Sequence, residues 1–199
     1  MKRITILNYK VGNQKSLEFF FNTIGYETIL TDSPKELKKA KLIILPGIGA
    51  FPTAMKSLKE NNLENIIKQK AKDNIPIIGI CLGMQLLASK SYEFSETDGL
   101  DLIPGKVIKM PKEEFHIGWN TLKTVNSITK LWYSNEDSFY FNHSYFFEGE
   151  EKYINAKSNL KIDMPAIISK NNVYGIQFHP EKSQQSGKNL MINLLNELI

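Results

Sequence analysis

The sequence predicts an α/β protein in which an open, mostly parallel central sheet is flanked by helices. In the first half of the chain, short aliphatic runs alternate with helical patterns, which is typical of a parallel sheet with helices on both faces. The second half carries short β-rich segments separated by Gly, Asn and Ser, which indicate an antiparallel extension. Its 199 residues show no repeat and no convincing linker, so residues 1–199 are expected to form a single domain.

Strands of the first half are predicted where aliphatic and β-branched residues cluster, at residues 4–7, 26–30, 42–45 and 75–80. Helices are expected between and after them, at residues 17–24, 55–58, 63–72 and 82–90. Another helix should start at Ser33-Pro34-Lys35-Glu36, with Ser33 as N-cap, Pro34 at the first helical position and Glu36 completing a capping box. Gly25 is a predicted helix stop.

The second half is expected to hold short strands at residues 106–110, 119–125, 138–141 and 153–156. Residues 166–169 and 173–178 are predicted to form a hairpin around Asn171-Asn172. Apolar residues at helical spacing between residues 187 and 199 indicate a C-terminal covering helix.

Composition excludes several classes of protein. Hydrophobic residues make up 42% of the chain and the net charge is +4, with lysines scattered among acidic residues, so neither disorder nor nucleic-acid binding is indicated. One cysteine permits no internal disulfide, and no apolar run suits a signal peptide or a membrane span. We therefore expect a cytoplasmic protein with no membrane contact. We expect no cofactor and no metal, because Cys81 and His179 are isolated from other ligands.

The central feature is the stretch from residue 74 to residue 85, NIPIIGICLGMQ. An apolar run ends at Cys81, which has Gly79 two residues before it and Gly83 two residues after it. This pattern predicts a strand, a sharp turn that exposes a thiol, and a helix whose N-terminus favours the thiolate. A buried structural cysteine is the alternative, and the stretch by itself leaves both open.

A thiol nucleophile requires a base and a group that orients the base. His179 follows a predicted strand, and Pro180 restricts it to an extended backbone. Glu181 then lies on the same side as His179, so the two form a candidate base and orienting carboxylate. The alternative is a surface loop in which both side chains meet water. Because strand ends of one sheet meet at one edge, Cys81 and His179 can come together there.

Three segments together, LPGIGAF (residues 45–51), GICLGMQLL (79–87) and GIQFHPEKS (175–183), resemble the signatures of class I, triad-type glutamine amidotransferases. The resemblance implies the flavodoxin-like architecture of that family. It also implies that Cys81 attacks the side-chain amide of L-glutamine, that His179 shuttles the proton and that Glu181 holds His179. Ammonia leaves, and water then releases glutamate.

The same resemblance implies an oxyanion hole. One donor is the backbone N–H of Leu82, and the other comes from Ile48 or Gly49 in the loop that begins at Pro46-Gly47. Glycines suit a loop that must present, or flip, a peptide group, although an ordinary strand-to-helix turn is the alternative. Further positions match family contacts to substrate glutamine: Gln85, Ser144 and Tyr145.

Three more segments, NYKVGN (residues 8–13), HIGWN (116–120) and YFNHSY (140–145), resemble the glutaminase subunits of imidazole glycerol phosphate synthases, enzymes of histidine biosynthesis. The resemblance implies a heterodimer in which ammonia is channelled into a (βα)8-barrel cyclase. It also implies a set of residues that face this partner: Asn8, Tyr9, Asn13, Trp119 and Asn120. Core packing is the alternative for Trp119. His116 and His143 are interpreted as structural residues or as part of the site lining, not as bases.

The sequence departs from the pattern of these subunits in three places. Asn8-Tyr9-Lys10 replaces Asp-Tyr-Gly, Glu93-Phe94-Ser95-Glu96 stands where a glycine pair is usual, and Phe115 replaces a proline. One alternative is therefore a paralogous subunit that supplies ammonia for amidation of a cell-surface sugar. A second is a stand-alone cysteine peptidase or γ-glutamyl hydrolase, and a third is a binding subunit with a relic triad.

Overall fold

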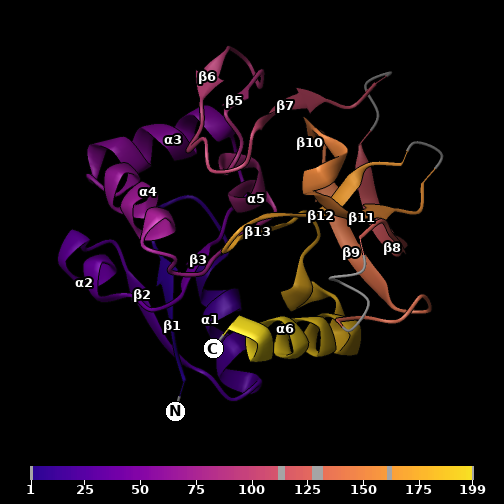
Figure 1. Ribbon diagram of the computed structural model, residues 1–199, viewed down its shortest axis with the longest axis horizontal. Helices are drawn as coiled ribbons and strands as arrows, with labels where there is room; N and C mark the ends of the chain where they lie inside the picture. Colours follow the sequence, from indigo (N-terminus) through magenta and orange to yellow (C-terminus); the bar gives the residue numbers. More distant parts are fainter. Residues whose placement is uncertain (1, 112–114, 127–131, 161–162, 199) are drawn as a thin grey trace.

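The computed structural model describes residues 2–111, 115–126, 132–160 and 163–198. In these ranges, strands of a large sheet lie between two layers of helices (Figure 1). The strands are β1 (Arg3–Leu7), β2 (Glu27–Thr31), β3 (Ile43–Leu45), β4 (Ile77–Ile80), β8 (His116–Thr124), β9 (Ser138–His143), β11 (Ile154–Ser158), β12 (Pro165–Lys170) and β13 (Val173–Ile176). Their order is β2-β1-β3-β4-β13-β12-β11-β8-β9.

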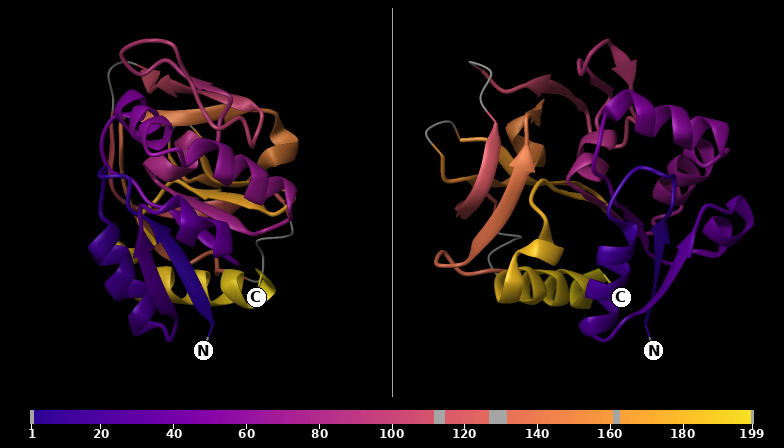
Figure 2. Two further views of the ribbon diagram at one scale, coloured as in Figure 1. Left: turned by 90° about the vertical axis from the view of Figure 1, so that its left-hand side faces the viewer. Right: turned by 180° about the vertical axis from the view of Figure 1, so that it is seen from behind.

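The sheet is parallel from β2 to β13 and antiparallel from β12 to β9. In the parallel part, β1 pairs with β2 and β3, and β4 pairs with β3 and β13. The later strands pair antiparallel with their neighbours and extend the sheet away from the N-terminal helices (Figure 2). This arrangement confirms the predicted fold class, including the antiparallel extension.

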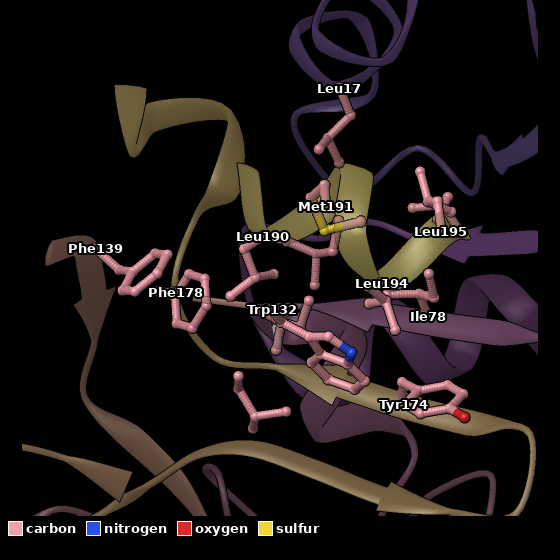
Figure 3. Packing of buried hydrophobic residues seen from close by; sticks show 14 of the residues in the cluster. Leu17, Ile78, Trp132, Phe139, Tyr174, Phe178, Leu190, Met191, Leu194 and Leu195 are labelled. Carbon is pink, nitrogen blue, oxygen red and sulfur yellow. The ribbon is translucent and has the colours of Figure 1, made fainter. Parts of the chain in front are cut away.

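Helices cover both faces because the central strands alternate apolar side chains between two cores. Helices α1 (Gln14–Thr23) and α6 (Gln184–Leu198) pack on one face, while α2 (Pro34–Lys39), α3 (Phe51–Glu60) and α4 (Glu64–Lys72) pack on the other. Ile78 belongs to the first core and its neighbour Ile77 to the second. Figure 3 shows the apolar side of α6, with Leu190 and Leu194, directed at Trp132 and the sheet.

Most predicted elements of the first half are present within one or two residues, but the reason for one helix start was wrong. Helix α2 begins at Pro34 as predicted, yet the side chain of Ser33 makes no capping hydrogen bond. Instead, the Ser33 backbone N–H donates to Thr31 Oγ1 at 3.0 Å. The turn that leads into the helix is therefore fixed by the Thr31 hydroxyl and not by the side chain of Ser33.

The helix after Cys81 is shorter than predicted. Helix α5 spans Leu82–Leu86, whereas residues 82–90 were expected to be helical. The chain leaves the helix because Ser89 N–H donates to the Gly105 carbonyl at 3.0 Å and Lys90–Ser91 forms strand β5. Strand β5 belongs to a second sheet that the sequence did not predict, in the order β10 (Tyr145–Gly149), β7 (Gly105–Lys109), β5 and β6 (Thr97–Asp98).

The hairpin of β12 and β13 turns at Asn171, whose φ is +54°, as the Asn-Asn signal predicted. Strand β13 then lies beside β4, and the short helix η4 (Pro180–Lys182) follows it. The carboxyl ends of β4 and β13 therefore meet at one edge of the sheet. In the part of the chain that is described, no helix is long and apolar enough to cross a membrane.

Candidate active site

Cys81 lies on a sharp elbow between β4 and α5. Its backbone has φ +54° and ψ −110°, a combination that a non-glycine residue adopts only under constraint. The Cys81 N–H donates to the Ile176 carbonyl at 2.7 Å, which anchors the elbow to β13. A Cβ on Gly83 would overlap the carbonyl oxygen of Leu45, and one on Gly79 would overlap that of Gly83, so both flanking positions require glycine.

His179 and Glu181 form a buried pair at the same edge. The side chains are each only 2% exposed, and His179 Nδ1 lies 2.8 Å from Glu181 Oε1. The His179 backbone N–H donates to the Tyr140 carbonyl at 2.8 Å, which ties the extended residue to β9. The carboxylate fixes Nδ1 as the protonated nitrogen and leaves Nε2 for proton transfer.

The electrostatic surroundings of His179 favour its protonated form. Burial lowers the pKa of this imidazole, but the neighbouring Cys81 and Glu181 side chains outweigh burial and raise the pKa to about 10. The buried Nε2 atom has no hydrogen-bond partner of normal geometry among the described residues.

Asn13 lies at this pair, although the sequence resemblance implied that it faces a partner. Its Nδ2 donates to Glu181 Oε1 at 2.7 Å. That oxygen accepts from both Asn13 and His179, while Glu181 Oε2 is buried and has no partner in the described part of the chain. Asn13 is half-buried, and its amide acts inward, on the carboxylate that orients His179.

The loop that precedes α3 contacts the elbow from the other side. The Leu82 N–H, which the family resemblance implied as an oxyanion donor, is directed at the Gly47 carbonyl at 3.4 Å. Gly49 has φ +127°, a conformation that favours glycine, and both Ile48 and Gly49 are exposed. The segments that carry the predicted oxyanion donors are thus adjacent. The Leu82 N–H, however, is directed at the Gly47 carbonyl and is not free for an oxyanion.

Tyr9 was predicted to face a partner, and this prediction was wrong. Its side chain is 0% exposed, and the phenol donates a hydrogen bond to the Pro46 carbonyl. Its own carbonyl accepts from Ser57 Oγ at 2.6 Å. Burial, with a smaller contribution from Cys81, raises the pKa of Tyr9 far above its ordinary value. Tyr9 is a neutral support beneath the loop at Pro46, because a ring so enclosed has no surface left for a partner.

A cavity of about 260 Å³ opens beside the thiol. Seven of the residues predicted from the sequence line it: Ile48, Gly49, Cys81, Leu82, Gln85, Ser144 and Tyr145. Gly47 does not line the cavity. A larger hollow of about 440 Å³ at β1 and β2 holds none of these residues, so the chemistry lies with the smaller one.

Sequence reasoning missed two residues that line the cavity, Glu93 and Asn142. His143 also lines it, which is one of the two roles that the sequence analysis left open. Glu93 is 8% exposed, and its Oε2 accepts from the Phe51 N–H at 2.7 Å, at the start of α3. Burial raises the pKa of Glu93 against the opposing effect of that hydrogen bond. Its position, twelve residues after the nucleophile in a charged run, carries no pattern that points inward.

His116 and His143 form a buried chain with Asn120. Asn120 Nδ2 lies 2.7 Å from His116 Nε2, His116 Nδ1 lies 3.2 Å from His143 Nε2, and His143 Nδ1 lies 2.9 Å from the Tyr145 carbonyl. Burial lowers the pKa of His116 to about 4, and burial with the neighbouring His116 lowers that of His143 to about 3. Both imidazoles are neutral at pH 7. His143 lines the cavity, whereas His116 contacts His143 and does not line it.

The remaining predicted partner-facing residues lie at or near the surface. Trp119 is 46% exposed and packs against Tyr140 with ring centroids 6.0 Å apart. Asn8 and Asn120 are half-buried. Within the described residues, no group of three or more His, Cys, Asp or Glu side chains could hold a metal ion.

Comparisons with known proteins agree with this geometry. A family model described as glutamine amidotransferase class-I matches residues 6–197. The imidazole glycerol phosphate synthase subunit HisH of Lactococcus lactis subsp. lactis is 43% identical over 202 residues, which covers 100% of both chains. The protein of the same name from Listeria monocytogenes is 42% identical over 192 residues, covering 94% of this chain and 92% of the relative. The predicted resemblance is therefore confirmed.

Solved structures share the fold at low sequence identity. PurLQS from Thermotoga maritima superposes with a TM-score of 0.80 at 18% identity, covering 100% of this chain and 99% of that chain. A glutamine amidotransferase from Thermotoga maritima gives a TM-score of 0.65 at 20% identity, covering 99% of this chain and 84% of that chain. Together with the sequence matches, these comparisons show that the chain belongs to the class-I glutamine amidotransferase family.

Proposed function

We propose that this chain is the glutaminase subunit of an imidazole glycerol phosphate synthase. It hydrolyses L-glutamine to glutamate and ammonia, and the ammonia passes to a (βα)8-barrel cyclase for histidine biosynthesis. The observation that carries the proposal is that Cys81, on a strained elbow, lines a cavity of about 260 Å³ and interacts with His179 of the buried His179–Glu181 pair. Relatives about 40% identical over nearly the whole chain carry the name of that subunit.

In the proposed reaction, Cys81 Sγ attacks the side-chain amide carbon of glutamine. The proton of the thiol goes to His179, which Glu181 orients at 2.8 Å. His179 then protonates the leaving nitrogen, so that ammonia departs and a γ-glutamyl thioester remains on Cys81. Water, deprotonated by His179, attacks the thioester and releases glutamate.

The tetrahedral intermediates of both steps carry an oxyanion that needs donors. Leu82 N–H is one candidate, but it is directed at the Gly47 carbonyl at 3.4 Å. We infer that this carbonyl must turn away before the oxyanion can bind, and that Gly47 and Gly49 permit the turn. Since Ile48 and Gly49 are exposed, a partner that docks over the loop could drive this rearrangement.

Charge in the cavity suits an amino-acid substrate. Glu93 is the carboxylate among the residues that line the cavity, and we propose that it pairs with the α-ammonium group of glutamine. Burial raises its pKa, and an ammonium beside it would restore the ionised form. Gln85 lies one helical turn after Cys81, Ser144 lies between β9 and β10, and Tyr145 begins β10, so these residues can contact the rest of the substrate.

The proposed docking face for the cyclase includes β8, which lies next to the edge strand β9. Apolar side chains alternate on its exposed side, with Phe115 65%, Ile117 58% and Trp119 46% exposed. An apolar patch of this kind marks a protein–protein contact. A sheltered route to the partner is needed because ammonia is largely protonated in water near pH 7 and is then no longer nucleophilic.

The direct test is glutamine-dependent synthesis by a reconstituted pair. The chain is co-expressed with a (βα)8-barrel cyclase and supplied with the ribulosyl phosphate intermediate of the histidine pathway. Glutamine should support synthesis of imidazole glycerol phosphate at a pH where free ammonia is scarce. A pair that co-purifies and hydrolyses glutamine but makes no product would favour the surface-sugar paralogue. Turnover of peptides or polyglutamates by the chain without a partner would favour the hydrolase alternatives.

We also propose that residues 1–199 act as one glutamine amidotransferase domain. The family match at residues 6–197 supports this. A cytoplasmic location stays a prediction from the sequence.

A further inference from the structure

Gln177 is a buried amide that the family signature did not assign to any role. It directly follows β13 and precedes His179 by two residues. Its exposed fraction is 0%, and its backbone N–H donates to the Ala166 carbonyl at 2.9 Å. A buried amide of this kind is stable only when its polar atoms find partners, so its contacts indicate its role.

The two ends of this amide contact two parts of the candidate site. Gln177 Nε2 lies 3.9 Å from Cys81 Sγ, within reach of a weak N–H···S hydrogen bond. Gln177 Oε1 accepts from Gln85 Nε2 at 3.2 Å. The side chain thus lies between the nucleophile and a residue that lines the substrate cavity.

The hydrogen-bond network fixes which way the amide points. Gln85 Nε2 also donates to the Tyr145 carbonyl at 2.9 Å. A carbonyl can only accept, so the Gln85 nitrogen is correctly placed and both of its hydrogens are engaged. Gln177 must therefore turn its oxygen toward Gln85 and its nitrogen toward the sulfur.

We propose that Gln177 is a positioning residue that stabilises the Cys81 thiolate with its amide N–H and couples the sulfur to Gln85 at the substrate cavity. The proposal rests on the proposed role of Cys81 as the nucleophile. A donor directed at the sulfur lowers the free energy of the charged form relative to the thiol. The amide does this without a titratable proton, so it does not compete with His179 for the proton of the thiol.

A second contact explains why a donor is needed there. Cys81 Sγ lies 4.0 Å from the Asn142 carbonyl, which can only accept and so favours the protonated thiol. The amide N–H of Gln177 opposes the effect of this carbonyl on the sulfur. Both amide hydrogens of Gln85 are engaged, by the Tyr145 carbonyl and by Gln177 Oε1. Its Oε1 therefore remains available to accept a hydrogen bond from a ligand.

The titratable groups near the sulfur are His179 with Glu181 behind it, Tyr9 beneath the loop at Pro46, and Glu93 and His143 in the cavity wall. Tyr9 and His143 are neutral at pH 7, since their pKa values are raised and lowered, respectively, by burial. The pH dependence of thiol alkylation is therefore influenced mainly by the protonation of His179 and secondly by that of Glu93. Substitution of Gln177 leaves all of these groups in place.

The test uses the pH dependence of thiol alkylation in the full chain. Cys81 is the one cysteine of the sequence, so iodoacetamide labelling followed by intact mass reports on it specifically. Gln177→Leu removes the amide at similar volume, and Gln177→Met removes it while keeping the chain length. Asn155→Leu is the matched control, because Asn155 is a buried amide of the same sheet but lies outside the site.

With Gln177→Leu, we expect the midpoint of the alkylation profile to rise by about one pH unit, so that the rate at pH values below the wild-type midpoint falls about tenfold. Gln177→Met should behave in the same way, and Asn155→Leu should leave the profile unchanged. Glutamine hydrolysis should fall mainly in kcat. Far-ultraviolet circular dichroism and urea unfolding verify that each variant is folded before it is compared.

Folded variants with the wild-type midpoint would overturn the proposal, even if their stability were reduced. If Gln177→Leu does not fold, the folded Gln177→Met decides by the same criterion. This failure is distinguishable from failure of the proposed function. Hydrolysis that disappears in Cys81→Ala, combined with unchanged alkylation profiles of the Gln177 variants, rejects only the role of Gln177.

Discussion

Asn13 donates a hydrogen bond of 2.7 Å to Glu181, the carboxylate that holds His179 at 2.8 Å. Asn13 comes from the loop between β1 and α1, and Glu181 lies in η4, 168 positions later in the chain. The same loop carries Tyr9, which donates to the Pro46 carbonyl. One N-terminal loop therefore supports both the orienting carboxylate and the loop expected to complete the oxyanion hole.

Asn13→Ala should slow catalysis with little change in substrate affinity. Loss of the donor leaves Glu181 held by His179 alone, because its Oε2 has no partner among the described residues. A hydrogen bond to a charged group contributes about 1.5–3 kcal/mol. If half of that is lost in the transition state, kcat for glutamine hydrolysis falls about four- to twelvefold while KM stays within about twofold.

The control for this variant is Asn61→Ala. Asn61 is also a half-buried amide, and it bonds the Ser57 carbonyl at 2.8 Å on α3, away from the triad. Its kcat should match that of the wild type. Equal kcat values for Asn13→Ala and the wild type would contradict the supporting role of Asn13.

Gly83→Ala should prevent the elbow from forming. A Cβ at this position would overlap the backbone oxygen of Leu45, so either β3 or α5 must shift. Overpacking against rigid backbone costs at least about 1–3 kcal/mol, and we expect the upper end of that range or failure to fold. Urea denaturation measures the change in the free energy of unfolding.

Gly25→Ala provides the comparison for Gly83→Ala. No atom lies within 4 Å of a Cβ at Gly25, and only its φ of +93° penalises the substitution. We expect a loss of about 1 kcal/mol there. An effect of Gly83→Ala no larger than that of Gly25→Ala would argue against the tight contact at the elbow.

Tyr9→Phe and Trp119→Ala should separate loop support from partner contact. Tyr9→Phe removes the hydroxyl that bonds the Pro46 carbonyl, and we expect a stability loss of about 1 kcal/mol with unchanged affinity for the cyclase.

Trp119→Ala truncates an exposed ring and should weaken cyclase binding at least tenfold with little change in stability. Binding is measured by titration calorimetry. Weakened cyclase binding by a folded Tyr9→Phe variant would contradict the buried role assigned to Tyr9.

Stability should fall as the pH is lowered from 7 to 5, in part because of His116 and His143. Their pKa values are lowered to about 4 and about 3 in the folded chain, whereas the unfolded chain takes up protons near pH 6.5. The unfolded state therefore binds more protons in this interval, and each histidine costs at most about 2 kcal/mol between pH 7 and 5. Urea midpoints at pH 7, 6 and 5 measure the slope.

His143→Gln is the comparison for this slope. A glutamine does not titrate, so the variant should lose less stability than the wild type over the same interval, whatever its stability at pH 7. His179 acts in the opposite direction, because the stabilisation from its raised pKa of about 10 is complete only below pH 6.5 and is lost progressively as the pH rises toward 10. His179 is present in both proteins, so the difference between their slopes reports on His143. An unchanged slope in His143→Gln would show that His143 is not held neutral.

The sequence predicted the parallel sheet and the meeting of Cys81 with His179 because both depend on local patterns. Aliphatic runs followed by glycine or proline mark strand ends, and strand ends of one sheet share an edge. Most of the cavity lining followed from the family resemblance, since those residues lie in the motifs themselves.

The positions of Tyr9 and Glu93 could not be predicted in this way. Each belongs to a polar loop whose sequence has no periodicity, and only the packing of distant segments determines which side chains turn inward. Tyr9 is buried against the loop at Pro46, and Glu93 against the start of α3. Strands β5 and β6 are two residues each, which is too short to produce an alternating pattern.

The most direct test of the account is glutamine hydrolysis by the cyclase complex of Cys81→Ala compared with that of the wild type. The substitution removes only the sulfur from a residue that is 6% exposed, so the fold and the complex should remain intact by circular dichroism and gel filtration. We expect glutamate release to fall at least about a thousandfold, because no other group can form the thioester. An intact complex that still releases glutamate within tenfold of the wild-type rate would contradict the assignment of Cys81 as the nucleophile.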